Sequence, residues 1–194
     1  MNILNQKKKK FEKGLSLIES AMVLALAATV TAGVMFYYQS ASDSNKSQSA
    51  ISLVMSATSA INGLYIGQAG YNGLSSSVLI NSSAIPDTYK NSNGNINNPF
   101  GGELVPVASE ASNNNYGYAL TLTKLPKSAC ISLATLNLGT SAKGYGVGIT
   151  NAANHTDFGS DASKGKAKVT PITPAEAATA CASDNDNTVT YFMK

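Results

Sequence analysis

The single histidine of the chain is the first place to look for catalysis. His155 lies in the polar stretch NAANHTDFG, two residues before Asp157, and the chain is rich in serine. These residue types could in principle form the Ser–His–Asp triad of a hydrolase. It would depend on neighbouring residues of one polar loop, so we interpret His155 as a solvated surface residue and predict no catalytic site.

Metal and phosphate sites are not predicted either. The stretch SDNDNT at 183–188 loosely resembles a calcium loop, but it lacks the glycine and the closing glutamate that such loops use, so we interpret it as a solvated loop. Two cysteines are too few for a typical structural zinc site, and no glycine-rich loop ends in Lys–Ser/Thr. We expect no metal and no cofactor, so the energy for any assembly step must come from another protein.

Cys130 and Cys181 are far apart in the sequence and form no C-x-x-C redox pair. In an exported chain a single cysteine pair usually forms a disulfide. This bond would close a loop of about 50 residues, worth about 4 kcal/mol in the chain-entropy model. Two buried free thiols are the alternative. Whether the chain is exported decides between a disulfide and free thiols.

Positive charge is concentrated at the N-terminus. Of the 14 lysines five lie within residues 7–13, and there is no arginine. Without residues 1–14, nine lysines face ten acidic residues, which leaves a net charge of −1. A near-neutral body without arginine is a poor nucleic-acid binder, so we expect no nucleic-acid partner and interpret the lysines as a membrane-topology signal.

Residues 15–38 form an apolar run in which Glu19 is the one charged residue. The run is long enough to span a bilayer as a helix, and the preceding lysines should remain cytoplasmic. It is longer than the apolar core of a cleaved secretory signal, so we expect it to be retained. A carboxylate within lipid costs about 2.5–3.5 kcal/mol on insertion scales, so Glu19 requires an explanation.

The stretch KGLSLIESAMVLALAA resembles the prepilin signature of type IV pilins. It has a basic leader, a glycine, a hydrophobic first residue and a glutamate at the fifth mature position. Leucine as first residue and a long leader are typical of the type IVb group, and NPFGGEL and LATLNLGTSAKGYGV are similar to its bundlin-like members. The resemblance implies that prepilin peptidase cuts between Gly14 and Leu15 and methylates the Leu15 amino group.

The same resemblance implies a function. The chain would be the major structural subunit of a type IVb pilus, a homopolymer used for adherence, bacterial aggregation and filament bundling. It would wait in the inner membrane, with a periplasmic head, and become extracellular on assembly. Its partners would be inner-membrane machinery with separate ATPases, an outer-membrane secretin and a host-cell surface receptor.

Two site assignments also follow from the resemblance. Glu19 would pair with the amino group of Leu15 on a neighbouring subunit, and a disulfide between Cys130 and Cys181 would bound a C-terminal region. For Glu19 the alternative is an interfacial carboxylate favoured by the helix dipole. For the whole chain the alternatives are a minor pilin or secretion-system pseudopilin, or a membrane-anchored periplasmic binding protein that never polymerises.

A long helix must carry these N-terminal residues. Apolar positions continue at helical spacing beyond residue 43, which predicts one helix from about Leu15 to Ile66. Its apolar face would consist of Ile51, Val54, Met55, Thr58, Ile61, Leu64 and Tyr65. Two helices broken near 40–44 are the alternative. We divide the chain into a leader (1–14), an apolar segment (15–38), an amphipathic continuation (39–66) and a head (67–194).

The head is predicted to be α+β, as in the type IV pilin fold. Period-2 patterns predict strands at 116–125, 144–150 and 188–193, the last of them central in the sheet. Helices are predicted at 126–139 and 173–182, with a short one near 74–80. Thr173, Pro174 and Glu176 have the spacing of a capping box, and both cysteines fall on predicted helices outside the sheet.

The N-terminus of the protein isolated from bacteria tests the leader assignment. We expect a chain that begins at Leu15, carries one added methyl group and has lost two hydrogens to the disulfide. Intact mass spectrometry before and after reduction measures all three. A chain that still begins at Met1 would contradict the assignment.

Overall fold

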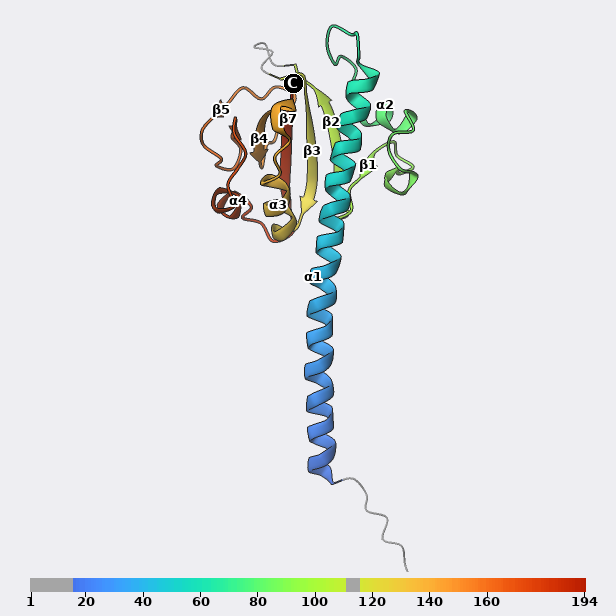
Figure 1. Cartoon of the computed structure of the whole chain (residues 1–194), viewed down its shortest axis with the longest axis vertical. Helices are drawn as coiled ribbons and strands as arrows, with labels where there is room; N and C mark the ends of the chain where they lie inside the picture. Colours follow the sequence, from blue (N-terminus) through green and yellow to red (C-terminus); the bar gives the residue numbers. More distant parts are fainter. Residues whose placement is uncertain (1–15, 111–115) are drawn as a thin grey trace, which may run out of the picture. The chain divides into compact units, whose positions relative to one another are not determined.

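The computed structural model describes residues 16–110 and 116–194. Gly14 and Leu15 therefore lie outside the described residues. The chain divides into two compact units, Met1–Ala41 and Ser42–Lys194 (Figure 1).

Helix α1 is continuous from Leu17 to Leu64. The predicted single helix is confirmed and the break near 40–44 is wrong, because no proline interrupts the backbone hydrogen bonds over this range. The predicted apolar face is only partly right. The buried helix residues are Ala50, Leu53, Val54, Ala57 and Ile61, whereas Met55 is 57% exposed. Ala50, Leu53 and Ala57 take core positions that the predicted face does not include, and Leu64 is 45% exposed.

The second unit contains one seven-stranded sheet in the order β1-β2-β3-β7-β4-β6-β5. All neighbours are antiparallel except the parallel pair β5 and β6. As predicted, β7 is central. The strands are β1 Ile96–Asn97, β2 Glu103–Ala108, β3 Tyr118–Leu125, β4 Ala142–Val147, β5 Phe158–Gly159, β6 Ala167–Lys168 and β7 Asn187–Met193.

The two faces of the sheet bury different clusters, as the alternation along β3 predicts. Tyr118, Leu120 and Leu122 belong to the main core, which also contains the buried α1 residues. Ala119 belongs to a smaller cluster on the other face, together with Phe192 of β7. Burial raises the pKa of Tyr118 to about 12, which is consistent with a hydroxyl held in an apolar core.

Three short helices and two 3-10 turns complete the second unit. They are α2 Ser76–Asn81, α3 Lys127–Ala134, α4 Pro174–Ala180, η1 Asp87–Tyr89 and η2 Gly139–Ser141. The predicted helix 126–139 ends too late, because tyrosines hold the chain after Ala134 in another conformation. Tyr191 donates a 2.7 Å hydrogen bond to the Leu133 carbonyl, and the Tyr145 hydroxyl accepts one from Leu138 N.

The predicted strand 144–150 is displaced toward the N-terminus by about two residues. Strand β4 ends at Val147, because Gly148 adopts a φ of +71° that turns the chain out of the sheet. Ile149 then folds back over Gly146, where a side chain could not fit. The turn depends on two glycines whose conformations the strand pattern does not reveal.

The turn NPFGG at 98–102 is organised by the buried Asn98. Its side-chain oxygen accepts hydrogen bonds from Phe100 N (2.9 Å) and Gly102 N (3.2 Å), and its amide donates one to the Thr123 carbonyl (2.8 Å). A Cβ on Gly102 would collide with the same Thr123 carbonyl. The turn therefore needs both an amide side chain and a glycine to start β2 beside β3.

We expect Gly102→Ala to lower the free energy of unfolding by about 1–3 kcal/mol, the usual cost of overpacking a close contact. Gly70→Ala is the control, because a Cβ there meets nothing within 4 Å. Denaturant titration of the detergent-solubilised chain measures both variants. Equal stabilities would contradict the role of Gly102.

Candidate assembly segment and disulfide-bounded region

Glu19 lies in the first turn of α1, where it accepts a hydrogen bond from a backbone amide. Its Oε2 is 2.8 Å from Ser16 N, so the carboxylate satisfies one of the free N–H groups at the start of the helix. The dipole of the helix also favours a negative charge here. A carboxylate can accept several hydrogen bonds, so this local bond leaves acceptor capacity for a second partner.

The side chains of α1 from Leu17 to Ala41 are all exposed. Large apolar side chains occur around the whole helix, and Leu17, Leu24 and Phe36 are 87%, 70% and 78% exposed. This helix is long and apolar enough to cross a membrane by length and composition. Thr29 and Thr31 donate their hydroxyls to Leu26 and Ala27 carbonyls, which makes both threonines compatible with an apolar environment.

Cys130 and Cys181 form a disulfide with a Cα–Cα distance of 5.9 Å. The predicted pairing is confirmed and the free-thiol alternative is wrong. Cys130 lies on α3, whereas Cys181 is the residue at the C-terminal cap of α4. The bond encloses β4, β5, β6 and α4, and so joins the C-terminal region to the helix beside the sheet.

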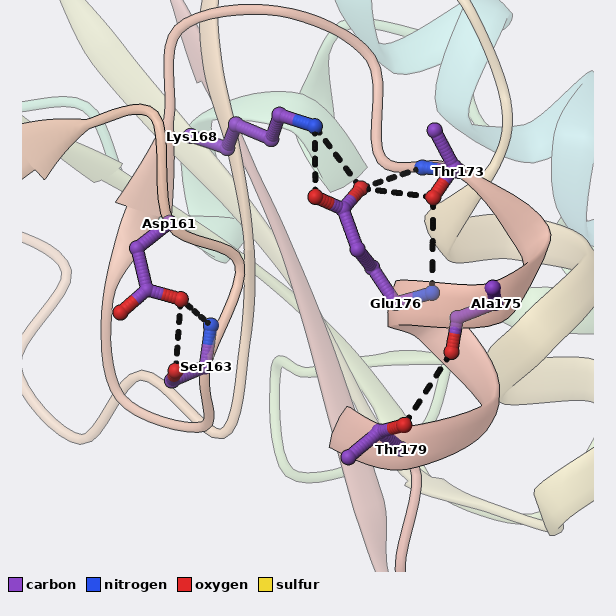
Figure 2. Close-up of polar contacts among 7 residues, drawn as sticks. All are labelled: Asp161, Ser163, Lys168, Thr173, Ala175, Glu176 and Thr179. Atoms are coloured by element: carbon purple, nitrogen blue, oxygen red, sulfur yellow. Dashed lines mark hydrogen bonds and ion pairs between the residues drawn. The ribbon is translucent and has the colours of Figure 1, made fainter.

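Glu176 is the centre of a polar network within this region (Figure 2). The predicted capping box is present, with Glu176 N donating to Thr173 Oγ1 and Thr173 N donating to Glu176 Oε2. Lys168 Nζ lies 2.8 Å from both carboxylate oxygens. Hydrogen bonds from Lys168, and then from Thr173, lower the pKa of Glu176 to about 2.

His155 does not have the surroundings of a catalytic base. Its ring stacks on Phe192 at a centroid distance of 5.0 Å, and its Nε2 lies 3.0 Å from the Asp157 backbone oxygen. Among the described residues no serine hydroxyl is bonded to it. The predicted solvated position is wrong, because the histidine is half-buried against an aromatic cluster.

The acidic stretch at 183–188 holds chain segments together. The Asp184 carbonyl accepts a hydrogen bond from Lys127 N, and Asn187 is buried. The Asn187 amide donates to Leu125 O and Ser183 O. Within residues 16–110 and 116–194, no group of three metal-ligating side chains occurs.

Comparison with known proteins decides the family. The bundlin family profile matches residues 39–194. The chain belongs to the bundlin family. It is 71% identical over 188 residues to the major structural subunit of the bundle-forming pilus of Escherichia coli O111:H-, and equally to that of Escherichia coli O127:H6 (strain E2348/69 / EPEC). Each alignment covers 96% of both chains.

Solved structures support the same fold. The type IV b pilin of Salmonella typhi matches with a TM-score of 0.55 at 20% identity, covering 75% of this chain and 97% of that one. TcpA, a type IV pilin of Vibrio cholerae El Tor, matches with a TM-score of 0.51 at 14% identity, covering 76% and 98%. The chain therefore has the type IV pilin fold, and its family makes it the structural subunit of a bundle-forming pilus.

Sequence reasoning missed several residues that hold the head together. Lys168 was not singled out, because its partner is eight residues away across a loop. The stretches that contain Asn98 and Asn187 have the composition of a turn and a polar loop, although a buried asparagine can bond several backbone groups. Asparagine at the junction of a loop and a strand is the one signal that could have found them.

We expect Glu176→Gln to destabilise the head at neutral pH, because glutamine keeps the cap but loses the charge that attracts Lys168. Since the Glu176 pKa is lowered in the folded chain, its contribution is present above the ordinary value of 4.5 and is lost as pH falls toward about 2. The stability difference from wild type should therefore vanish over that window. Thermal unfolding at several pH values tests this, with Asp157→Asn as control. A difference that persists at pH 2 would contradict it.

Proposed function

We propose that this chain polymerises through the apolar part of α1 into an extracellular filament, as the major subunit of a type IVb pilus. The observation that carries the proposal is the apolar surface of residues 17–41, which is exposed throughout. Surface of this extent needs lipid or other copies of the same helix to cover it. Its relative is named the major structural subunit of the bundle-forming pilus. That name supports cover by other copies of the helix.

The polymer would replace lipid by helices of neighbouring subunits. Small residues at i, i+4 spacing, such as Ala21 with Ala25 and Thr29 with Gly33, allow close approach of two backbones. A side chain at Gly33 would meet nothing within 4 Å in the isolated chain. That open surface is available to a second helix.

Glu19 supplies the one charge in this segment. Once water and lipid headgroups are excluded, a lone carboxylate costs several kcal/mol and needs an opposite charge. Cleavage between Gly14 and Leu15 by prepilin peptidase would create that charge at the amino group of Leu15. Methylation yields a secondary amine, which keeps the charge. Pairing with Leu15 of a neighbouring subunit would set the axial register of the filament.

The remaining steps need other proteins. The subunit would enter the inner membrane with its lysine-rich leader in the cytoplasm, and inner-membrane machinery with separate ATPases would drive its addition to the filament. An outer-membrane secretin would conduct the filament to the cell surface. There it would mediate adherence through a host-cell receptor and aggregate bacteria. Insertion, assembly, export and adherence would require no catalytic reaction by this chain.

Replacement of Glu19 by glutamine tests assembly apart from insertion. We expect Glu19→Gln to enter the membrane and lose its leader normally. The yield of sheared surface filaments should fall at least about tenfold, because a loss of about 1.4 kcal/mol in the binding free energy of each subunit contact already lowers affinity tenfold. Ser20→Ala is the neighbouring control. Immunoblots of membranes and electron microscopy of sheared material measure the two steps. Normal filament yield from Glu19→Gln would show that the segment is a simple anchor.

A further inference from the structure

The face of the sheet turned away from α1 is only partly covered. In the second unit, α1 packs on one face through the main core. On the other face, Tyr116, Phe192 and Ile149 form the smaller cluster. Beside this cluster the surface is hollowed into a groove of about 580 Å³, formed by β2, β3, the start of β7 and residues 147–153.

The floor of the groove consists largely of β-branched side chains. Val105, Thr121 and Thr123 line it from adjacent strands. Thr121 and Thr190 share a hydrogen bond of 3.0 Å between their hydroxyls, so the Thr121 hydroxyl is already satisfied. The floor therefore offers methyl groups and a satisfied hydroxyl, which suit contact with another protein surface rather than with a small charged ligand.

The groove carries one positive and one negative side chain. Lys164 lies over Gly148, where its Cγ occupies the space of a side chain, and Asp186 comes directly before β7. The three ion pairs among the described residues are Lys90–Asp87, Lys166–Asp161 and Lys168–Glu176. Lys164 and Asp186 take part in none of them, so both charges face solvent in the isolated head.

Opposite charges on one surface make that surface complementary to a second copy of itself. In a two-fold contact, residue i of one copy meets residue j of the other, and the reverse pair forms at the same time. Lys164 of each copy can then meet Asp186 of the other. Residues 163–166 are all exposed, so the turn that carries Lys164 can enter the groove of the second copy.

We propose that this groove is the lateral contact between filaments, occupied by the 163–166 turn of a head in a neighbouring filament. The inference rests on the proposed function, in which the heads form the outer surface of the filament and can therefore meet heads of another filament. A single contact of this size is weak. Filaments repeat it along their length, so many weak contacts add to a stable bundle.

Charge reversal tests the proposal on assembled filaments. Asp186→Lys and Lys164→Glu each place like charges opposite one another, and we expect the fraction of filaments in bundles to fall at least about tenfold because every repeat is affected. The double variant restores opposite pairs and should bundle like wild type. Filaments of the two single variants, mixed after separate preparation, should also bundle together.

Matched controls carry the same change in charge outside the groove. Asp157→Lys and Lys127→Glu alter exposed side chains that do not line it, and both should bundle normally. Wild-type bundles should loosen as added salt screens the pairs. If either reversal impairs assembly, Asp186→Asn and Lys164→Gln should show the same loss of bundling more weakly.

Filament yield separates this proposal from the proposed function. If wild-type protein forms no filaments, the proposed function fails. If the reversed variants form filaments that bundle as wild type, or if the mixture stays dispersed, the groove is not the lateral contact, whatever else binds there. Restoration in both the double variant and the mixture supports direct pairing between the two side chains.

Discussion

The uncovered apolar surface of α1 is the constraint on which the rest of this protein depends. Residues 17–41 expose leucine, valine, methionine and aromatic side chains around the whole helix. The free energy of such a surface in water is unfavourable in proportion to its area. Every state of the chain must therefore cover this surface. In a pilus, neighbouring subunits can cover it, and the length and composition of the helix are also compatible with a membrane.

Glu19 limits which cover is stable. Near the cytoplasmic end of a membrane span a carboxylate can reach the headgroup region, and the bond from Ser16 N holds it against the helix start. In a packed core of helices that escape is lost, and the charge must meet an opposite one. In the proposed polymer, Glu19 would therefore need the new amino terminus that the proposed cleavage before Leu15 creates.

The head is stabilised by means that suit an exported protein with few charges. One disulfide joins α3 to the end of α4, and buried asparagines complete the hydrogen bonds of loops. The Lys168–Glu176 pair fastens the loop before α4 to its cap. These bonds are local to the head, so the sheet face opposite the helix can carry few charges without loss of stability.

The sequence by itself determined the long helix, the position of the one charge in its apolar segment, the α+β head, the central last strand, the capping box and the cysteine pair. These features are local, or depend on composition and periodicity, and need no knowledge of distant neighbours. Only the tertiary structure decided that Ala50 and Ala57 face the core instead of Met55, and that α3 ends at Ala134. It also decided that His155 stacks on Phe192, and that Lys164 and Asp186 share one groove. Each of these depends on which segments the sheet brings together, and the long-range pairing of strands is not encoded in any short stretch of the chain.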